Sequence, residues 1–384
     1  MNKKEVNEIR RRLSPEKHCI SKIYGCYVNT NREIISYLEE SFGLMPEFEA
    51  EKYSSLLKKV LSGTIGKNLI DIVFSTQQVA DSDEHRLLSA LRNSGLQDRE
   101  ARDCFYQKVI DSLDMDGSNY LILLATDTYD VPTRGKDDEL LMDASDTVFT
   151  YVLCCVCPVK DGKEELGYDP GENEFHSCTP VQIVGAPELG FLFPAFDDRA
   201  ANIYDALYYS KNPAQLHQEF IDAIFHVEPP MPASEQKETF QDVLAGALEE
   251  DFRFQVVQSV HEQIRERIEQ HLESKNPEPL DVTAREIGNI LENCGVPEER
   301  VQAFQERCSE EFGVGAALNP DNIIDRKRFE IKTPQVRILV DPEFSYLVET
   351  RIIDGRKYLL IPSDDRVEIN GMEVSASPEL PESD

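Results

Sequence analysis

The chain has 384 residues, a length that favours two or three domains over a single core. Its 72 acidic and 40 basic residues give a formal net charge of −32, which repels polyanions unless basic residues gather locally. No apolar run approaches the roughly 18–20 residues of a membrane span, and the charged N-terminus lacks the apolar region of a secretory signal. Nine cysteines, an odd number, are typical of free thiols in a reducing cytoplasm. We therefore predict a cytoplasmic protein without a membrane segment.

Residues 1–212 are predicted to form a mixed N-terminal α+β domain. Pro, Ser and Gly at the expected cap positions indicate helices at 46–63 and 82–95. Two apolar segments, Tyr120–Ala125 and Thr147–Cys157, read as the strands of a long antiparallel hairpin that encloses an acidic loop. The segment after Asp197-Asp198 is predicted to turn helical.

The remainder divides into three parts. Residues 213–316 are predicted to be a helical region, in which apolar side chains four residues apart, from Val256 to Leu272, form one stripe. Residues 317–374 alternate apolar and polar side chains around Asp354-Gly355 and Asn370-Gly371, which predicts a small antiparallel β module. Residues 375–384 are predicted to be a disordered acidic tail. The fold class is α+β.

The acidic loop is the first candidate site. Asp127 directly follows a buried strand, where catalytic carboxylates often lie, and Asp130 with further aspartates, Asp137, Asp138, Asp143 and Asp146, could hold Mg²⁺ or Mn²⁺. Arg134 is available for a phosphate. The competing interpretation, which we favour, is the solvated tip of a hairpin, because the spacing matches no EF-hand and Pro132 and Gly135 are turn residues.

A second candidate is the segment around Asp198 and Arg199. At a helix N-terminus these residues would cap the helix and complement its dipole, which is a sufficient structural explanation. The functional interpretation joins them with Asp127 and Arg134 in a polar cleft lined by Tyr204 and Tyr208. That cleft would suit a metal-dependent hydrolase or phosphoesterase. No zincin, P-loop, kinase or hydrolase-elbow motif is present, and no cofactor is evident beyond the divalent metal of this alternative.

The third candidate is a group of basic residues in the C-terminal module. If Arg337 and Arg351 share a face with the hairpin residues Arg356 and Lys357, they would form a phosphate-binding surface. The alternative is a solvated face balanced by nearby carboxylates. The candidate nucleic-acid-binding residues are Arg326, Lys327, Arg328, Arg337, Arg351, Arg356 and Lys357.

Four segments carry a family resemblance: GKNLIDIVFSTQQVADSDEH, YLILLATDTYDVPTRGKDD, APELGFLFPAFDDRAANIYDALYY and LVETRIIDGRKYLLIP. They resemble an uncharacterised family of Firmicutes proteins, domain of unknown function 4317, over nearly the whole chain. That family implies no established activity. The order of parts is also similar to the nucleoid-associated 37 kDa protein family, which implies a cytosolic, dimeric, nucleic-acid-associated protein without catalysis.

Two classes of function therefore remain. We favour a non-enzymatic binding protein that contacts nucleic acid through the basic C-terminal module and forms a homodimer. The alternative, a metal-dependent enzyme, requires that Asp127, Asp130, Asp198 and Arg199 converge in one cleft.

Overall fold

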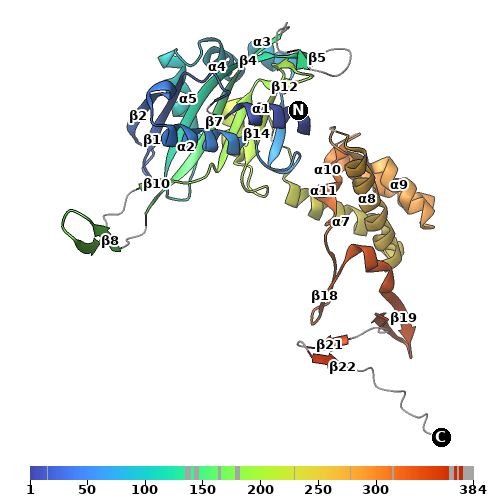
Figure 1. The fold of residues 1–384 in the computed structure, drawn as a ribbon. Helices are drawn as coiled ribbons and strands as arrows, with labels where there is room; N and C mark the ends of the chain where they lie inside the picture. Colours follow the sequence, from blue (N-terminus) through green and yellow to red (C-terminus); the bar gives the residue numbers. More distant parts are fainter. Residues whose placement is uncertain are drawn as a thin grey trace. The chain divides into compact units, whose positions relative to one another are not determined.

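The computed structural model describes residues 1–14, 16–134, 140–141, 147–162, 166–177, 182–228, 230–276, 278–313, 315–362, 367–369 and 372–374. The chain forms two compact units (Figure 1). The first comprises residues 1–236 with 276–279, and the second 237–275 with 280–384. The division thus falls later than the predicted boundary at residue 212, because α6 (Gln218–Phe225) buries four apolar side chains in the core of the first unit.

An antiparallel sheet of eight strands is the centre of the first unit. Its order is β2–β1–β4–β7–β11–β14–β3, with β10 paired to β7. The strands are β1 (Lys22–Val28), β2 (Ile34–Ser41), β3 (Leu69–Val73), β4 (Asn119–Val131), β7 (Thr147–Asp161), β10 (Gln182–Val184), β11 (Leu189–Phe193) and β14 (Asp205–Ser210).

The predicted long hairpin is confirmed as the pair β4 and β7. Their register is continuous from Asn119 opposite Val159 to Val131 opposite Thr147. Between them the structure describes β5 (Thr133–Arg134), which pairs with β6 (Leu140–Leu141). The loop aspartates at positions 137, 138, 143 and 146 lie outside the described residues.

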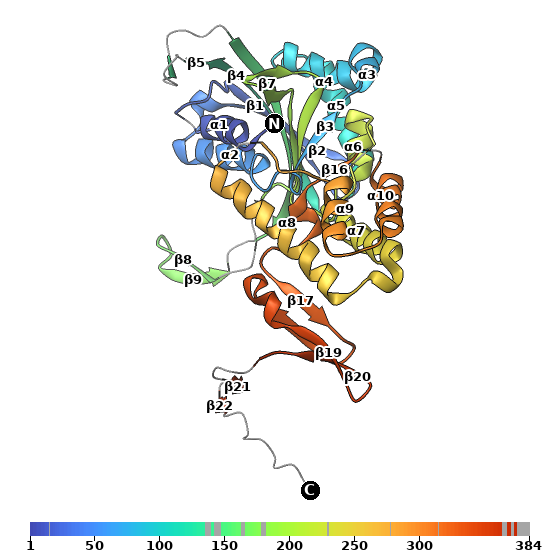
Figure 2. The same cartoon turned by 90° about the vertical axis from the view of Figure 1, so that its right-hand side faces the viewer.

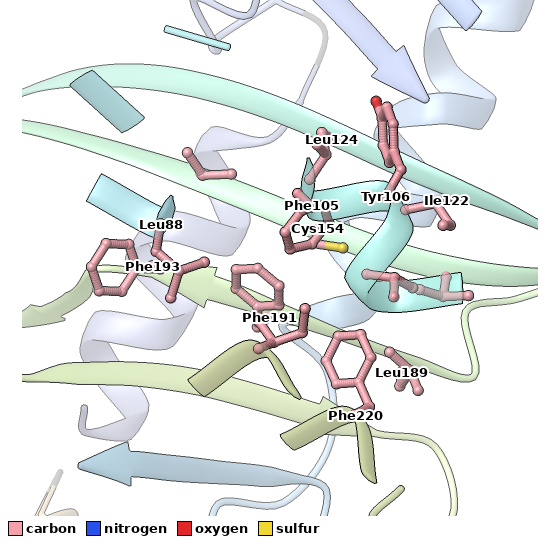
Figure 3. Close-up of a cluster of buried hydrophobic side chains, with 14 of the residues drawn as sticks. Leu88, Phe105, Tyr106, Ile122, Leu124, Cys154, Leu189, Phe191, Phe193 and Phe220 are labelled. Atoms are coloured by element: carbon pink, nitrogen blue, oxygen red, sulfur yellow. The ribbon is translucent and has the colours of Figure 1, made fainter. Parts of the chain in front are cut away.

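Helices cover both faces of this sheet (Figure 2). The helices α1 (Lys3–Arg12) and α2 (Glu47–Val60) bury apolar side chains on one face, and α4 (Asp83–Asn93), α5 (Arg99–Ser112) and α6 on the other. Because side chains alternate along a strand, Cys154 enters the core beside α5 and α6 while Cys155 enters the opposite core. Figure 3 shows Cys154 among the aromatic rings of its core.

The prediction of a helix after Asp198 is wrong. Residues 195–210 form β12 (Ala195–Asp197), β13 (Ala200–Asn202) and β14. Asp198 and Arg199 take left-handed backbone angles, with φ of 47° and 59°, and make the two-residue turn between β12 and β13. Both faces of the sheet are covered at β14, so Ala206–Tyr209 are all buried, and such a continuous apolar run does not distinguish a strand from a helix.

Smaller elements complete the first unit. The segment after β7 contains a two-stranded hairpin. These elements are η1 (Phe42–Leu44), α3 (Thr76–Asp81), β8 (Leu166–Asp169) and β9 (Glu174–Ser177).

The second unit has its own helical core, as the sequence predicts. Val256, Val260, Ile264 and Ile268 are buried along one side of α8, whereas Leu272 at the end of the predicted stripe is 52% exposed. The elements of this core are α7 (Ala233–Leu248), η2 (Glu249–Asp251), α8 (Phe254–Ser274), β15 (Val282–Thr283), α9 (Ala284–Asn293), α10 (Glu298–Phe312), β16 (Ala317–Leu318) and α11 (Pro320–Ile323).

The C-terminal part of this unit consists of antiparallel hairpins, which confirms the predicted β character. The Phe329 ring packs against Phe254 and His261 of α8, at centroid distances of 6.0 and 5.3 Å. The tail 375–384 lies outside the described residues. The elements are β17 (Phe329–Lys332), β18 (Arg337–Val340), η3 (Pro342–Leu347), β19 (Glu349–Ile353), β20 (Arg356–Leu360), β21 (Val367–Ile369) and β22 (Met372–Val374). The chain is thus α+β in both units.

Candidate functional site

Asp127 is a buried carboxylate on β4, and 2% of the residue is exposed. Arg12 donates from Nε to Oδ2 at 2.8 Å and from Nη2 to Oδ1 at 3.3 Å. The Cys19 amide donates to Oδ1 at 2.7 Å, and the Tyr151 hydroxyl donates to Oδ2 at 2.9 Å. Donors from three other segments of the chain therefore occupy both carboxylate oxygens.

Arg12 lies in the last turn of α1, and its side chain is only 15% exposed. It also donates to the Thr128 carbonyl at 2.6 Å, and its guanidinium lies 4.7 Å from the centre of the Tyr129 ring. Burial lowers the pKa of Arg12, but the hydrogen bond to Asp127 and its charge outweigh burial and raise that pKa. Burial and the Asp127 charge raise the pKa of Tyr151, which keeps its hydroxyl a donor.

A chain of polar contacts links this pair to Arg199. The Tyr129 hydroxyl donates to Glu8 Oε1 at 2.8 Å, and Arg199 Nη1 donates to Glu8 Oε2 at 3.1 Å. Arg199 Nη2 also donates to the Pro132 carbonyl at 2.8 Å. Burial and the hydrogen bond to Glu8 raise the pKa of Tyr129 to about 12. Arg199 therefore anchors its left-handed turn to α1 and to the end of β4.

The other candidates of the predicted cleft are placed differently. Asp130 is exposed and, three residues from Asp127 on one strand, faces the opposite side of the sheet. Asp198 is exposed at its turn, and Arg134 lies on β5. The structure brings Asp127 and Arg199 into one network, joined through Arg12, Tyr129 and Glu8, without Asp130.

The tyrosines expected to line the cleft do not lie there. Tyr208 is buried, and its hydroxyl donates to the Leu216 carbonyl at 2.8 Å. Tyr204 is 43% exposed in the turn directly before β14. Tyr204 and Tyr208 belong to a turn and a strand, not to the helix that the sequence predicts after Asp198.

Sequence reasoning missed Arg12 and Tyr151 as partners of Asp127, and Glu8 as the residue that joins Tyr129 to Arg199. In the sequence, Arg12 is one of three consecutive arginines, Arg10–Arg12, which does not distinguish it from its neighbours. One signal was available: Arg12 lies three residues after the buried Ile9, so both residues fall on one side of α1. An arginine beside the buried stripe of a helix is a candidate partner for a buried carboxylate.

A second polar cluster joins three carboxylates of the first unit. The Met1 amino nitrogen lies 3.2 Å from Asp71 Oδ1 and 3.6 Å from Asp197 Oδ1. Asn202 Nδ2 donates to Asp197 Oδ2 at 3.1 Å and to Asp205 Oδ2 at 2.6 Å. Burial raises the pKa of Asp71 and, together with the charges of Asp71 and Asp197, the pKa of Asp205. This cluster explains why the end of β12 carries an aspartate.

Three of the candidate nucleic-acid-binding residues have acidic partners within the second unit. Arg326 pairs with Asp321 at 3.7 Å, Arg337 with Glu330 at 2.5 Å and Arg351 with Glu349 at 2.7 Å. The other four are exposed, and no carboxylate of the described residues lies within ion-pair distance of them. We call these four the free cations; they are Lys327, Arg328, Arg356 and Lys357.

The β19–β20 register separates two of the free cations. Ile353 is opposite Arg356, and Ile352 is opposite Lys357, across the turn Asp354-Gly355. Because adjacent residues of a strand point to opposite faces, Arg356 and Lys357 do not share a face, contrary to the expectation from the sequence. Each face of this hairpin pairs an exposed isoleucine with a free cation.

Among the residues that the structure describes, no group of three or more His, Cys, Asp or Glu side chains is arranged to hold a metal ion. Over the same part of the chain, no helix is both long and apolar enough to cross a membrane.

A family model described as "Domain of unknown function (DUF4317)" matches residues 1–372. The chain belongs to this family. The DUF4317 match covers both units, so it includes the Asp127 network and all seven basic candidates of the C-terminal module. It confirms the resemblance carried by the four quoted segments. A search of the curated proteins finds no match to this DUF4317 chain.

Proposed function

We propose that this DUF4317 protein is a non-enzymatic binding protein that contacts nucleic acid through its basic C-terminal module. The observation that carries the proposal is a local reversal of charge. Residues 326–360 hold eight lysines and arginines against five aspartates and glutamates, in a chain with 40 basic and 72 acidic residues. The free cations are available for phosphate because no described carboxylate neutralises them. The similarity to nucleoid-associated 37 kDa proteins points the same way and remains a prediction.

Fluorescence anisotropy with a labelled duplex tests this proposal. If four phosphates are contacted, the affinity falls about 100-fold between 50 and 200 mM salt. Replacing all four free cations with glutamate is expected to weaken binding at low salt by at least about tenfold. The matched control replaces the exposed residues Lys3, Lys4, Lys52 and Lys59 with glutamate and so makes the same change in net charge.

Two outcomes would contradict the proposal. One is no binding by the wild-type chain at 50 mM salt. The other is an equal loss in the control variant, which would mean that net charge alone, and not the C-terminal module, sets the affinity.

We also infer that the module mediates self-association into a homodimer. Large apolar side chains stand exposed here: Ile352 is 70% exposed, Leu339 53%, Ile353 43% and Tyr358 42%. Ile353 and Tyr358 lie on one face of the β19–β20 hairpin and Ile352 on the other, and exposed apolar groups of this size mark interaction surfaces in soluble proteins. In addition, an isolated two-stranded hairpin is marginally stable in water, and a second copy would cover the β19–β20 hairpin.

The hydrolase alternative has less support. Both oxygens of Asp127 already accept hydrogen bonds from protein donors, and Asp130 faces away from it. A melting assay with Mg²⁺ or Mn²⁺ separates the two functions. A metal-dependent rise in Tm that disappears in Asp127→Asn would favour the enzyme and overturn the binding proposal.

A further inference from the structure

A pocket of about 650 Å³ opens in the helical core of the second unit. It lies between the first residues of α9, the C-terminal half of α10 and the loop that follows α10. Its volume falls within the range of roughly 300–1,000 Å³ that is typical of small-molecule sites. No candidate residue from the sequence belongs to it, and it is separate from the free cations.

The lining of the pocket combines apolar and polar side chains. Cys308 and Leu318 are 3% and 5% exposed and line it together with the half-buried Phe312. Burial raises the pKa of Cys308 to about 12, so its thiol acts as a small apolar group. Gln305 and Ser309 on α10 add polar groups. Such a lining suits a ligand with an apolar body and few polar atoms.

The described residues that line the pocket carry a positive charge, in contrast to the acidic chain as a whole. Among the described residues that line the pocket, no carboxylate is present, although acidic residues outnumber basic ones 72 to 40 in the whole chain. The single ionic side chain among those lining residues is Arg285, at the start of α9. Arg285 is exposed, and no described carboxylate lies within ion-pair distance of it. A guanidinium without a partner is suited to bind a carboxylate through paired hydrogen bonds.

We propose that this pocket binds a small organic acid with an apolar body and one carboxylate. The apolar body lies against Cys308, Phe312 and Leu318, and the carboxylate pairs with Arg285. This function is independent of nucleic-acid binding, because the pocket contains none of the free cations.

Isothermal titration of the full chain with three probes tests the proposal: decanoate, decanol, which lacks the charge, and acetate, which lacks the apolar body. Decanoate is expected to bind, and the other two to bind at least about tenfold more weakly. Circular dichroism at the highest decanoate concentration checks that the protein stays folded.

Two pairs of variants locate the site. Arg285→Glu removes the cation, and Arg307→Glu makes the same change at an exposed residue of α10 outside the lining. Ser309→Phe fills the pocket, whereas Ser309→Ala leaves it open. Decanoate binding should weaken at least about tenfold in Arg285→Glu and Ser309→Phe and persist in the other two.

Three results would overturn the proposal: no decanoate binding by the wild-type chain, equal binding of decanol, or decanoate binding that survives Arg285→Glu. If Ser309→Phe fails to fold, the exposed Arg285 still provides the test, since its replacement removes no buried contact.

Discussion

At the scale of single residues, the Asp127–Arg12 pair is the contact whose loss should matter most. The Asp127 side chain has no exposed surface, and that of Arg12 has 15%. Removing one member of a buried pair leaves the other charge without compensation, which typically costs about 3–5 kcal/mol. We therefore expect Asp127→Asn to lower the free energy of unfolding by about 3 kcal/mol, measured by urea denaturation.

Asp130→Asn is the matched control for this prediction. Asp130 lies on the same strand but is exposed on the other face, so its replacement should change the free energy of unfolding by less than about 0.5 kcal/mol. Equal effects of the two substitutions would refute a structural role for the buried pair.

Asp127 could be selected from the sequence because it directly follows a strongly apolar run. The helix pattern marks Arg12 only as one candidate partner, because Arg12 lies 115 residues away in the chain and meets Asp127 only when α1 packs on the sheet. A buried carboxylate in a strand predicts that a cation must be near it. Which cation it is depends on tertiary packing that no local pattern encodes.

The cluster around Asp205 predicts a dependence of stability on pH. Burial and the charges of Asp71 and Asp197 raise the pKa of Asp205, while the Met1 amine opposes this. The folded state then holds the Asp205 proton more tightly than the unfolded state does. The ionised Asp205 carboxyl therefore lowers the free energy of unfolding at neutral pH. This destabilisation disappears as pH falls through the raised pKa toward the ordinary value of 3.8.

Asp205→Asn removes this titration and keeps an oxygen to accept the Asn202 hydrogen bond. We expect the variant to be more stable than wild type at pH 7 and the difference to shrink as pH approaches 4. Thermal melting of both proteins across this range is the measurement. A difference that grows on acidification would contradict the assignment.

At the scale of elements, caps and turn residues predicted most of the structure. Pro46, Ser82 and Gly95 correctly bounded the helices α2 and α4, and Asp354-Gly355 correctly placed a hairpin. The failure at residues 199–210 has a definite cause. Two-residue hairpin turns favour Asn-Gly or Asp-Gly. This turn is Asp198-Arg199 in left-handed conformation, and it lacks the glycine by which such a turn is recognised in a sequence.

The turn of the β19–β20 hairpin carries the third prediction. Gly355 has φ of 75°, and a Cβ there would meet no atom within 4 Å. The cost of alanine at this position therefore comes only from the left-handed backbone conformation, and not from a steric clash. We expect Gly355→Ala to destabilise the hairpin by about 1 kcal/mol. Amide hydrogen exchange in β19 and β20 should then be about fivefold faster, with exchange in β4 and β7 unchanged.

Gly43→Ala is the matched control, because a Cβ at Gly43 also meets no atom within 4 Å and its φ is not in the left-handed range. If both variants leave amide hydrogen exchange in β19 and β20 unchanged, the left-handed glycine does not stabilise this hairpin.

At the scale of the whole molecule, the two proposed interactions of the C-terminal module should respond oppositely to salt. Nucleic-acid binding releases counterions and therefore weakens as salt rises. Self-association brings together two copies of net charge −32, whose mutual repulsion is screened when the Debye length falls below about 10 Å above 0.1 M salt. The apolar contact through the exposed side chains of the β19–β20 hairpin does not lose strength under these conditions.

We therefore expect the dimer dissociation constant, measured by sedimentation equilibrium, to decrease between 50 and 300 mM salt. Ile352→Asp should abolish the dimer, because it places a charge at the most exposed apolar position of the hairpin. Val73→Asp adds the same charge to a 61% exposed valine on β3 of the first unit and should leave the dimer unchanged. If the dimer weakens as salt rises, electrostatic attraction between the two copies stabilises it. The free cations would then bind the second copy instead of phosphate.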